Sequence, residues 1–207
     1  MKYVSPLLTG TRNKIIMDNN TYFIADTHIG FGSRRTVAVR GFGSNWERHE
    51  QEVLNGINRV INKHKELYIL GDVGSSDDYE HLKQFLGKIN TRRLHLVLGN
   101  HDNEKFFQRL KAEHVIVDYD KIYQVKYNRI HFTLCHYPIF EWEGFFKNGI
   151  HLYGHTHNNL ELGWKSMDVG IDNIGYTPIN INEVITLLGK YSNIDKYHKK
   201  LVLDKRY

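Results

Sequence analysis

Residues 93–102 read RLHLVLGNHD, a short apolar run of strand character that ends in a glycine and three polar residues. The same pattern occurs twice earlier in the chain, as TYFIADTH at residues 21–28 and as ELYILGD at residues 66–72. Apolar runs of this length, bounded by Gly, Asn or Asp, are typical of buried strands that lead into loops. These three stretches decide the fold class, because they place polar side chains at the ends of buried strands.

Amphipathic helices are predicted between these strands. From Trp46 to about Lys63 the apolar residues recur at spacings of three, four and seven, and residues 77–89 and the segment up to Ala112 are also predicted to be helical. Strand and helix therefore alternate in the first half of the chain, which indicates βαβ units on a parallel sheet.

One segment of the first half is expected to be irregular. Residues 31–45 are rich in Gly and Arg and are predicted to form a loop. Ser44 or Asn45 is placed to cap the helix that begins at Trp46, since short polar residues are favoured at that position.

The second half is predicted to be mostly strand. VIVDY, KIYQVKY, RIHFTLC and IHLYG follow one another within residues 115–154, with a last strand at 166–171 and a short helix at 181–189. This order predicts an antiparallel set of strands packed against the parallel sheet. The expected fold class is α/β, a two-sheet α/β/β/α sandwich forming one domain over residues 1–189, followed by a basic tail at 190–207.

Composition excludes several classes of protein. Of the 207 residues, 41% are hydrophobic and 25% charged, which is typical of a globular domain. No apolar run approaches the ~20 residues needed to cross a bilayer, and the N-terminal sequence is unlike a secretory signal. The single cysteine, Cys135, agrees with a reducing compartment. We therefore expect a cytoplasmic protein without a membrane partner; oligomeric state is left open.

The net charge of +5 raises the question of an anionic partner such as nucleic acid. Residues 190–207 contain six Lys or Arg and two Asp, so +4 of the excess lies in the tail. This distribution favours a solvated basic segment over a substrate groove, and nucleic acid is only weakly indicated.

Polar residues gather at the ends of five predicted strands: Asp26, His28, Asp72, Asn100, His101, Asp102, His136, His155 and His157. In α/β sheets ligands bind outside the carboxyl ends of the strands, so these ends are expected to converge. Their carboxylate, amide and imidazole donors suit Mn, Fe, Zn, Co or Ni. Seven of them exceed the needs of one ion and suit two ions about 3.5 to 4 Å apart.

In chain order the motifs are DTH (26–28), GD (71–72), GNHD (99–102), CHYP (135–138) and GHTH (154–157). Together they resemble the calcineurin-like metallophosphoesterase family, and the later sequence SMDVGID resembles the end of its small single-domain bacterial and phage members. The motifs span residues 26–157, and the resemblance implies the α/β/β/α sandwich of that family.

The resemblance also implies a ligand role for each motif. The first ion would be held by Asp26, His28 and His157. The second would be held by Asn100, His136 and His155. Asp72 would bridge the two ions, for which Mn²⁺ is the first expectation and Fe, Zn, Ni or Co the alternatives.

His101 would not be a ligand in this scheme. The resemblance implies that it is catalytic and gives a proton to the leaving group, with Asp102 orienting it. Asp102 is also predicted to cap the helix that it opens. Phe31 stands where many close relatives carry a histidine, a departure that bears on substrate choice or rate.

The activity implied is hydrolysis of a small phosphate ester, in particular a nucleotide-like phosphodiester, by a hydroxide that bridges the two ions. Two alternatives stay open. One is a nuclease that acts on polymeric DNA or RNA, and the other is a metal-binding interaction module whose hydrolase site is idle.

Two further groups are predicted to bind substrate. Arg34 and Arg35, with Arg40, follow the first motif and could clamp a phosphate, although a solvated loop explains them equally. Trp142 belongs to an aromatic cluster with Phe140, Phe145 and Phe146 that could stack on a base, although core packing or a dimer contact is the alternative.

Overall fold

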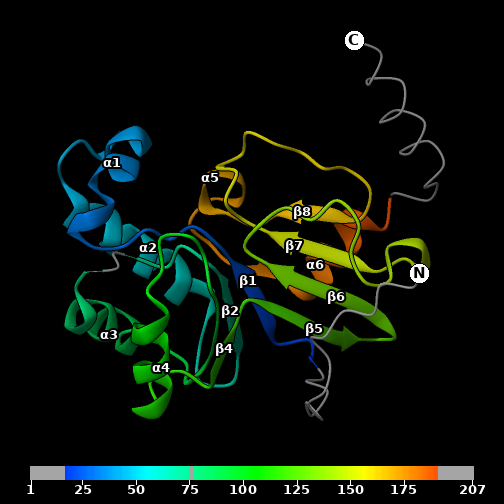
Figure 1. Ribbon diagram of the computed structural model, residues 1–207, viewed down its shortest axis with the longest axis horizontal. Helices are drawn as coiled ribbons and strands as arrows, with labels where there is room; N and C mark the ends of the chain where they lie inside the picture. The colour runs from blue at the N-terminus through cyan, green and yellow to red at the C-terminus, as the bar shows by residue number, and fades with distance from the viewer. Residues whose placement is uncertain (1–16, 75–76, 191–207) are drawn as a thin grey trace, which may run out of the picture.

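A computed structural model describes residues 17–74 and 77–190 (Figure 1). Apart from Lys190, the predicted tail at 190–207 lies outside the described residues. Within the described ranges, no helix combines the length and the apolar character that crossing a bilayer requires.

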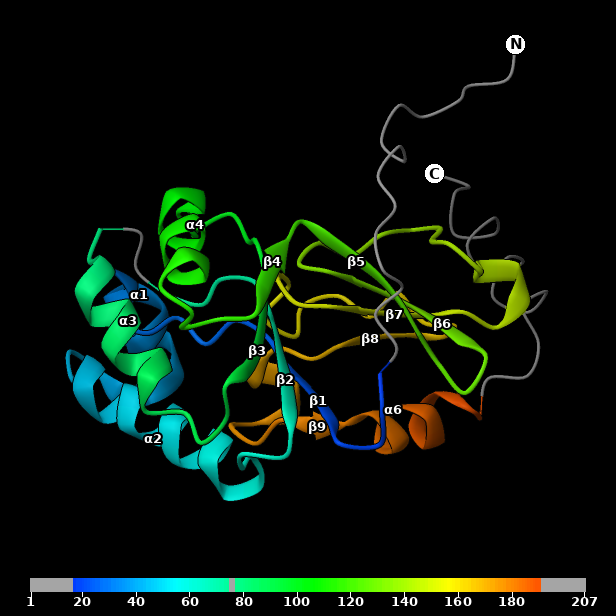
Figure 2. The same ribbon diagram turned by 90° about the horizontal axis from the view of Figure 1, so that it is seen from below.

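The first sheet has the strand order β4-β3-β2-β1-β9 (Figure 2). Strands β1 (Thr21–Ile24), β2 (Glu66–Leu70), β3 (Arg93–Val97) and β4 (Asp118–Asp120) are parallel. Strand β9 (Ile179–Asn180) pairs antiparallel with β1. The predicted parallel sheet is therefore confirmed for the first half of the chain.

Helices cover one face of this sheet: α2 (Trp46–Val60), α3 (Tyr79–Gly87) and α4 (Glu104–Ala112) (Figure 2). The side chain of Asn45 caps α2 by accepting a hydrogen bond from the Arg48 amide at 2.9 Å, which confirms one of the two predicted caps. Because strand side chains alternate between faces, Leu67 and Ile69 pack in the cluster under the helices, whereas Tyr68 and Leu70 pack toward the second sheet.

The second sheet has the order β5-β6-β7-β8. Strands β5 (Ile122–Tyr127) and β6 (Ile130–Cys135) are antiparallel, but β7 (Ile150–Tyr153) and β8 (Ser166–Asp168) are parallel to β6. The prediction of an antiparallel set is wrong here. The connections after β6 and β7 are long enough to return the chain to the starting edge, which a parallel pair requires.

Three smaller expectations also fail. Only the end of VIVDY is a strand, and this strand, β4, joins the first sheet. The strand predicted at 166–171 stops at Asp168 and is followed by α5 (Ile171–Ile174). The predicted loop at 31–45 forms short helical turns, η1 (Phe31–Ser33), α1 (Arg34–Val37) and the π-helical η2 (Ala38–Phe42).

The chain's last described helix, α6 (Ile181–Leu188), adds Ile181, Val184 and Leu188 to the apolar cluster shared by the two sheets. The molecule is thus a two-sheet α/β sandwich, and a further 3-10 turn, η3 (Phe145–Lys147), lies in the loop before β7.

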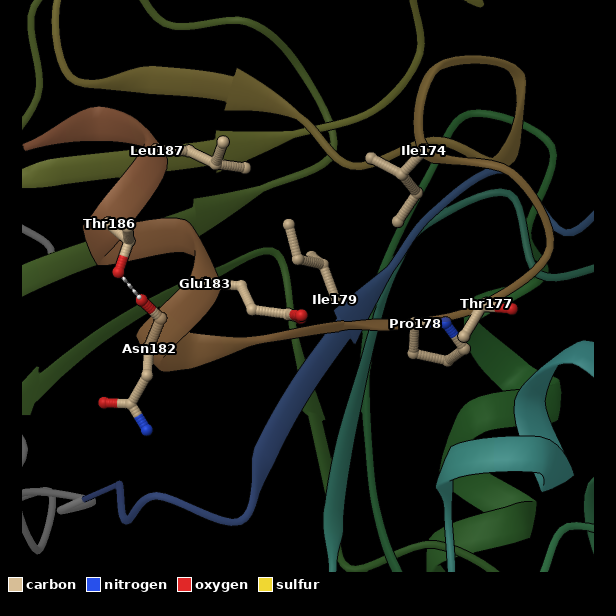
Figure 3. Close-up of a pocket in the computed structure, with 8 residues that line it drawn as sticks. All are labelled: Ile174, Thr177, Pro178, Ile179, Asn182, Glu183, Thr186 and Leu187. Atoms are coloured by element: carbon tan, nitrogen blue, oxygen red, sulfur yellow. Dashed lines mark hydrogen bonds between the residues drawn. The ribbon is translucent and has the colours of Figure 1, made fainter. Parts of the chain in front are cut away.

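An open groove of about 570 Å³ runs beside α6, lined in part by Ile174, Ile179 and Leu187 (Figure 3). Glu183 supplies the carboxylate among the residues that line the groove. This carboxylate accepts a hydrogen bond from the Asn180 amide at 3.0 Å and so completes the cap of α6. None of its lining residues is a predicted ligand, and the groove is separate from the site described next.

Candidate metal centre

The predicted ligands meet because five strands end at the same edge of the sandwich. The loops after β1 and β2 are joined by hydrogen bonds from the Asp26 amide to the Gly71 carbonyl (3.1 Å) and from the His28 amide to the Asp72 carbonyl (2.9 Å). The loop after β7 joins them where the His155 amide donates to the Asp26 carboxylate at 2.9 Å.

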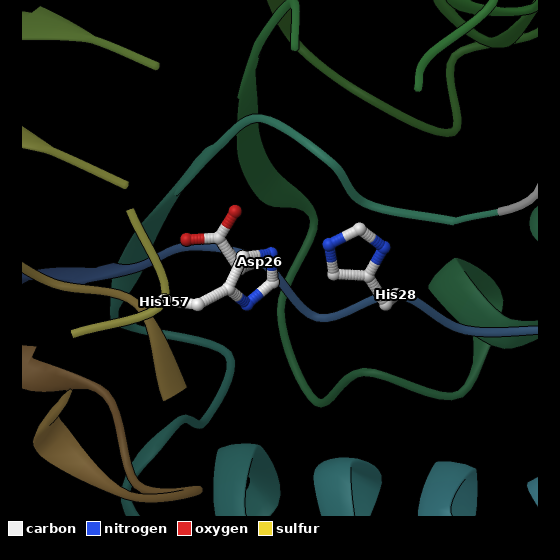
Figure 4. A group of neighbouring side chains, drawn as sticks. All are labelled: Asp26, His28 and His157. Carbon is white, nitrogen blue, oxygen red and sulfur yellow. The ribbon is translucent and has the colours of Figure 1, made fainter. Parts of the chain in front are cut away.

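One set of possible ligands, the first group, consists of Asp26, His28 and His157, whose ligand atoms all lie within 4.8 Å of one another. Figure 4 shows Asp26 and His28 on the loop after β1 and His157 on the segment that follows β7. The rings of His28 and His157 are stacked, with their centroids 5.1 Å apart. This set equals the one predicted for the first ion.

The second group consists of Asp26, Asp72 and His136, again within 4.8 Å. Asn100 adjoins it, with its side-chain oxygen 3.0 Å from His136 Nε2 and 2.9 Å from His155 Nδ1. All seven predicted ligands therefore lie in one connected cluster.

Asp72 lies between the two groups. Its Oδ2 atom is 3.5 Å from His28 Nε2, and its Oδ1 atom is 3.4 Å from His136 Nε2. This is the position that a bridging carboxylate needs. Asp26 also belongs to both groups, a sharing that the sequence did not predict.

Hydrogen bonds to one ring nitrogen fix which nitrogen of a histidine is free. His136 Nδ1 donates to the Leu70 carbonyl at 3.0 Å, which leaves Nε2 toward Asn100 and Asp72. His157 Nδ1 donates to Asp172 Oδ2 at 2.7 Å, which leaves Nε2 free. Such outer partners orient metal-ligating imidazoles in proteins.

Asp26 and His28 show why a cation suits this cluster. Burial raises the pKa of Asp26 to about 7 and lowers the pKa of His28 to about 3. His28 is therefore neutral at pH 7, and its buried Nε2 has no hydrogen-bond partner among the described residues. A divalent ion would pair with this lone pair and favour the ionised form of Asp26, so the residues present fit a metal.

Asp72 and His136 shift the pKa values of one another. Burial acts to raise the pKa of Asp72, but the hydrogen bond and charge of His136 outweigh it and lower the pKa to about 2. Burial acts to lower the pKa of His136, but Asp72 raises it. Asp72 is therefore ionised at pH 7, and its carboxylate oxygens can act as ligands of a cation.

The backbone of the cluster is strained. Five of the seven predicted ligands have positive φ: Asp26 (56°), His28 (44°), Asp72 (49°), His155 (71°) and His157 (47°). Non-glycine residues rarely adopt this conformation, and where they do it marks sites whose geometry the surrounding fold imposes for function.

Two glycines of the motifs permit the close approach of the loops. A Cβ atom on Gly154 would lie 2.5 Å from Asp26 Oδ2, and one on Gly99 would collide with Asp72 Oδ1. Glycine is therefore required at both positions for the carboxylates to reach their places.

His101 lies at the exposed rim of the cluster. Its amide donates to Asp72 Oδ1 at 2.9 Å, and its ring centroid is 5.5 Å from that of His28. It is thus beside the two groups without belonging to either.

The expectations for Asp102 are corrected. The side chain that caps α4 is Asn103, which accepts from the Lys105 amide at 3.1 Å. The Asp102 carboxylate accepts from the amides of Asp72, Val73 and Gly99 at 2.8 to 2.9 Å, and among the described residues it has no hydrogen bond with the His101 ring. Asp102 joins the loops after β2 and β3, because its carboxylate accepts from backbone amides of both loops.

The predicted substrate residues separate into two kinds. Arg34 and Arg35 on α1 are exposed, as a phosphate clamp requires. Trp142 is 6% exposed, packs with Phe145 and Trp164, and donates from Nε1 to the Gly149 carbonyl at 3.0 Å. The stacking platform predicted on Trp142 is therefore wrong, because its faces are used in a small aromatic core.

Arg40 is likewise unavailable to substrate. Its side chain is 5% exposed and forms an ion pair with Asp172. Asp172 belongs to none of the predicted ligand motifs, and its place at the end of the SMDVGID stretch, four residues after β8, was the available signal.

Tyr137 is the aromatic residue at the rim that the sequence did not single out. Its side chain is 45% exposed, and its ring centroid is 4.9 Å from that of His155 and 5.1 Å from that of His136. Its position next to His136 in CHYP was the available signal.

Comparison with known proteins adds a fold but no activity. No family model matches the chain. Over 86 residues it is 34% identical to the Gene 66 protein of Mycobacterium phage L5, a match that spans 41% of this chain and 40% of the phage protein. Its structure resembles the crystal structure of a protein of unknown function from Aquifex aeolicus, with a TM-score of 0.60 and 21% identity, over 81% of this chain and 98% of that one. The two-sheet α/β fold is therefore shared with a solved protein.

Proposed function

We propose that the protein is a dinuclear metal-dependent phosphoesterase of the calcineurin-like type that hydrolyses phosphodiesters. The observation that carries the proposal is the connected cluster of seven ligand residues, in which Asp72 faces both His28 and His136. Two divalent ions, with Mn²⁺ the first expectation, would bind the phosphate oxygens and supply the hydrolytic water in an activated form.

The chain's own residues then have separate tasks. The first group would hold one ion, the set of Asn100, His136 and His155 would hold the other, and Asp72, which faces both sets, would contribute a carboxylate to each. His101, fixed through its amide to Asp72 at 2.9 Å, holds a proton at its ring and gives it to the departing ester oxygen.

The rim favours a diester with an aromatic or heterocyclic group. Asn100, His101 and His155 are exposed, so a phosphate with two ester groups can reach them from solvent. Tyr137 offers its ring beside His155, and Arg34 and Arg35 offer guanidinium groups on α1. We therefore propose a small nucleotide-like substrate.

The test is hydrolysis of bis-p-nitrophenyl phosphate and p-nitrophenyl phosphate by the full chain with Mn²⁺, Ni²⁺, Zn²⁺ or Mg²⁺. We expect metal-dependent hydrolysis, faster for the diester, and a loss of about 10² to 10⁴-fold in kcat for His101→Ala with unchanged metal content. His64→Ala, an exposed histidine before β2, is the matched control and should retain full activity.

Two results would contradict the proposal. Metal uptake without hydrolysis of either ester would favour an idle metal-binding module. Equal rates for His101→Ala and the parent protein would remove the proposed proton donor.

A further inference from the structure

We infer that Arg40 and Asp172 are positioning residues for the first group, and that they set the ring orientation of His157 and the backbone position of Asp26. The inference rests on the proposed metal centre. Neither residue belongs to a ligand motif, and the two are 132 positions apart in the chain.

Asp172 connects the two side chains. Its Oδ2 atom accepts from His157 Nδ1 at 2.7 Å and from Arg40 Nη2 at 2.5 Å, while its Oδ1 atom accepts from Arg40 Nε at 2.8 Å. The pairing with arginine is therefore bidentate, which fixes the plane of the carboxylate. A fixed carboxylate at Nδ1 holds His157 in the tautomer whose Nε2 lone pair is free for an ion.

Arg40 also reaches the other half of the first group. Its Nη2 atom donates to the Asp26 carbonyl at 2.9 Å, next to a residue held at a φ of 56°. Its Nη1 atom lies 3.2 Å from His49 Nε2, which must accept because a guanidinium only donates. One guanidinium is thus fixed on three sides, with its side chain 5% exposed.

Because the ion pair of Arg40 and Asp172 is largely buried, its role is to hold the neighbouring side chains in place and not to attract substrate from solvent. Burial acts to raise the pKa of Asp172, but hydrogen bonds from Arg40 and His157 outweigh it and lower the pKa. Lysine cannot replace Arg40, since a single ammonium cannot reproduce the planar fork toward Asp172 together with the bond to the Asp26 carbonyl.

The pair also connects the site to the helical turns that replace the predicted loop. Arg40 lies on η2, within the exposed segment that carries Arg34 and Arg35. Through Asp172, Arg40 attaches this segment to His157, which belongs to the first group alone, whereas Asp26 belongs to both groups. Loss of Asp172 should therefore weaken the ion that His157 would hold and spare the other.

The experiment is a titration of the metal-free full chain with Mn²⁺, in which electron paramagnetic resonance measures the free ion. It compares the parent protein with Asp172→Ala, Asp172→Asn and Arg40→Lys. We expect one of two binding steps to weaken by about 10 to 100-fold in Asp172→Ala, as is usual for outer-shell partners, and the other step to stay within about twofold. Asp172→Asn should lose less, because its amide oxygen still accepts from Nδ1.

A readout without metal accompanies the titration. Two-bond ¹H–¹⁵N spectra of the metal-free protein should show His157 protonated at Nδ1 in the parent protein and in Asp172→Asn, and a mixture of tautomers in Asp172→Ala. Asp118→Asn, which removes an exposed ion pair with Lys111, is the matched control and should change neither readout.

The outcomes separate this inference from the proposed function. If the parent protein takes up no ion, both fail. If it binds two ions and Asp172→Ala matches it in both steps and in tautomer, only the inference fails. Retention of the second binding step shows that a variant is folded, and Asp172→Asn provides the test if Asp172→Ala does not fold.

Discussion

Strand β2 has a buried carboxylate at each end, and the two ends of the first sheet differ in how those charges are compensated. At the amino end, Glu66 accepts from Arg93 at 3.3 Å and from Thr21 at 3.2 Å, and it lies 3.1 Å from His95. Arginine supplies the positive charge that the carboxylate needs. Burial acts to raise the pKa of Glu66, but these partners lower it.

At the carboxyl end, Asp26 and Asp72 share a site with imidazoles. His136 compensates the burial of Asp72, but the burial of Asp26 is not compensated and its pKa rises to about 7. The backbone is left-handed at both carboxylates. Both ends contain an imidazole nitrogen without a partner among the described residues, in His28 and in His95. The candidate ligand site therefore differs from the structural cluster in the uncompensated burial of one carboxylate, Asp26, together with backbone strain.

Two buried histidines, His136 after β6 and His151 on β7, also differ in how their ring nitrogens are bonded. His136 and His151 are both 0% exposed. His151 donates from Nδ1 to the Thr133 carbonyl and accepts at Nε2 from the Ile139 amide, both at 3.0 Å. His136 bonds a backbone group with one nitrogen only and turns the other toward Asn100. Burial alone does not distinguish the two roles.

The largest expected effect is a loss of hydrolysis on substitution at the carboxyl end of the first sheet. Asp26→Asn removes a ligand common to both groups and should lower diester hydrolysis by on the order of 10³-fold, since several kcal/mol of metal stabilisation is lost. The metal-free protein should be no less stable at pH 8 by urea unfolding, because the amide has no charge to desolvate. A fall of several kcal/mol in its free energy of unfolding would contradict the comparison.

The pH dependence of the same carboxylate comes next. The folded pKa of Asp26, about 7, lies above its ordinary 3.8, so the folded state holds this proton more tightly than the unfolded state. The contribution of Asp26 to metal-free stability is therefore full below pH 3.8 and is lost as the pH rises to 7. Mn²⁺ affinity should fall about fivefold between pH 7 and pH 6, because the ion must displace a proton that half of the Asp26 side chains hold at pH 7 and nearly all hold at pH 6.

Titration calorimetry at the two pH values checks this prediction. The same titration of Asp26→Asn is the control, since it has no proton to displace at that position. An affinity of the parent protein that does not depend on pH would assign the raised pKa to another group.

A substitution at the amino end of the first sheet should lower stability and leave catalysis unchanged. Glu66→Gln should lower the free energy of unfolding by about 1 to 3 kcal/mol, because Arg93 and His95 lose a charged partner, and should leave kcat for the diester unchanged. Urea unfolding of the metal-free protein measures the first effect. Glu80→Gln, which removes an exposed pair with Arg109, should change stability by no more than about 0.5 kcal/mol.

The smallest effect concerns the rim of the carboxyl end. Tyr137→Ala should raise KM for the aromatic diester by several-fold, equivalent to about 1 kcal/mol of ring stacking, with kcat and metal content retained. Tyr137→Phe should behave as the parent protein. Phe146→Ala removes a ring that is 67% exposed in the turn before β7 and serves as the aromatic control. An equal rise in KM for Phe146→Ala would remove Tyr137 from the substrate site.

Much of the fold was accessible to sequence reasoning because its signals are local. The apolar runs of β1, β2 and β3 and the helical spacing of α2 do not depend on distant residues, and these elements lie where they were predicted. The direction of β7 is different in kind. It depends on how a long connection crosses the sheet, and the alternation of residues within a strand is the same in either direction.

The direction of β7 also determines whether the candidate ligands meet. Because β6 and β7 are parallel, His136 and the GHTH segment leave the sheet at the same edge. An antiparallel pair would have sent them to opposite edges, so the predicted convergence needed a topology that the strand predictions did not contain.

The sequence by itself determined the positions of most strands, of the main helices and of the seven candidate ligand residues, since polar motifs at strand ends are visible in one dimension. Only the tertiary structure decided the sharing of Asp26, the place of Asp102 beneath three amides, the burial of Trp142 and the pairing of Arg40 with Asp172. Most of these are contacts between segments far apart in the chain. Whether a polar or aromatic side chain faces solvent, a neighbour or a ligand depends on what the fold brings against it, and no local pattern encodes that.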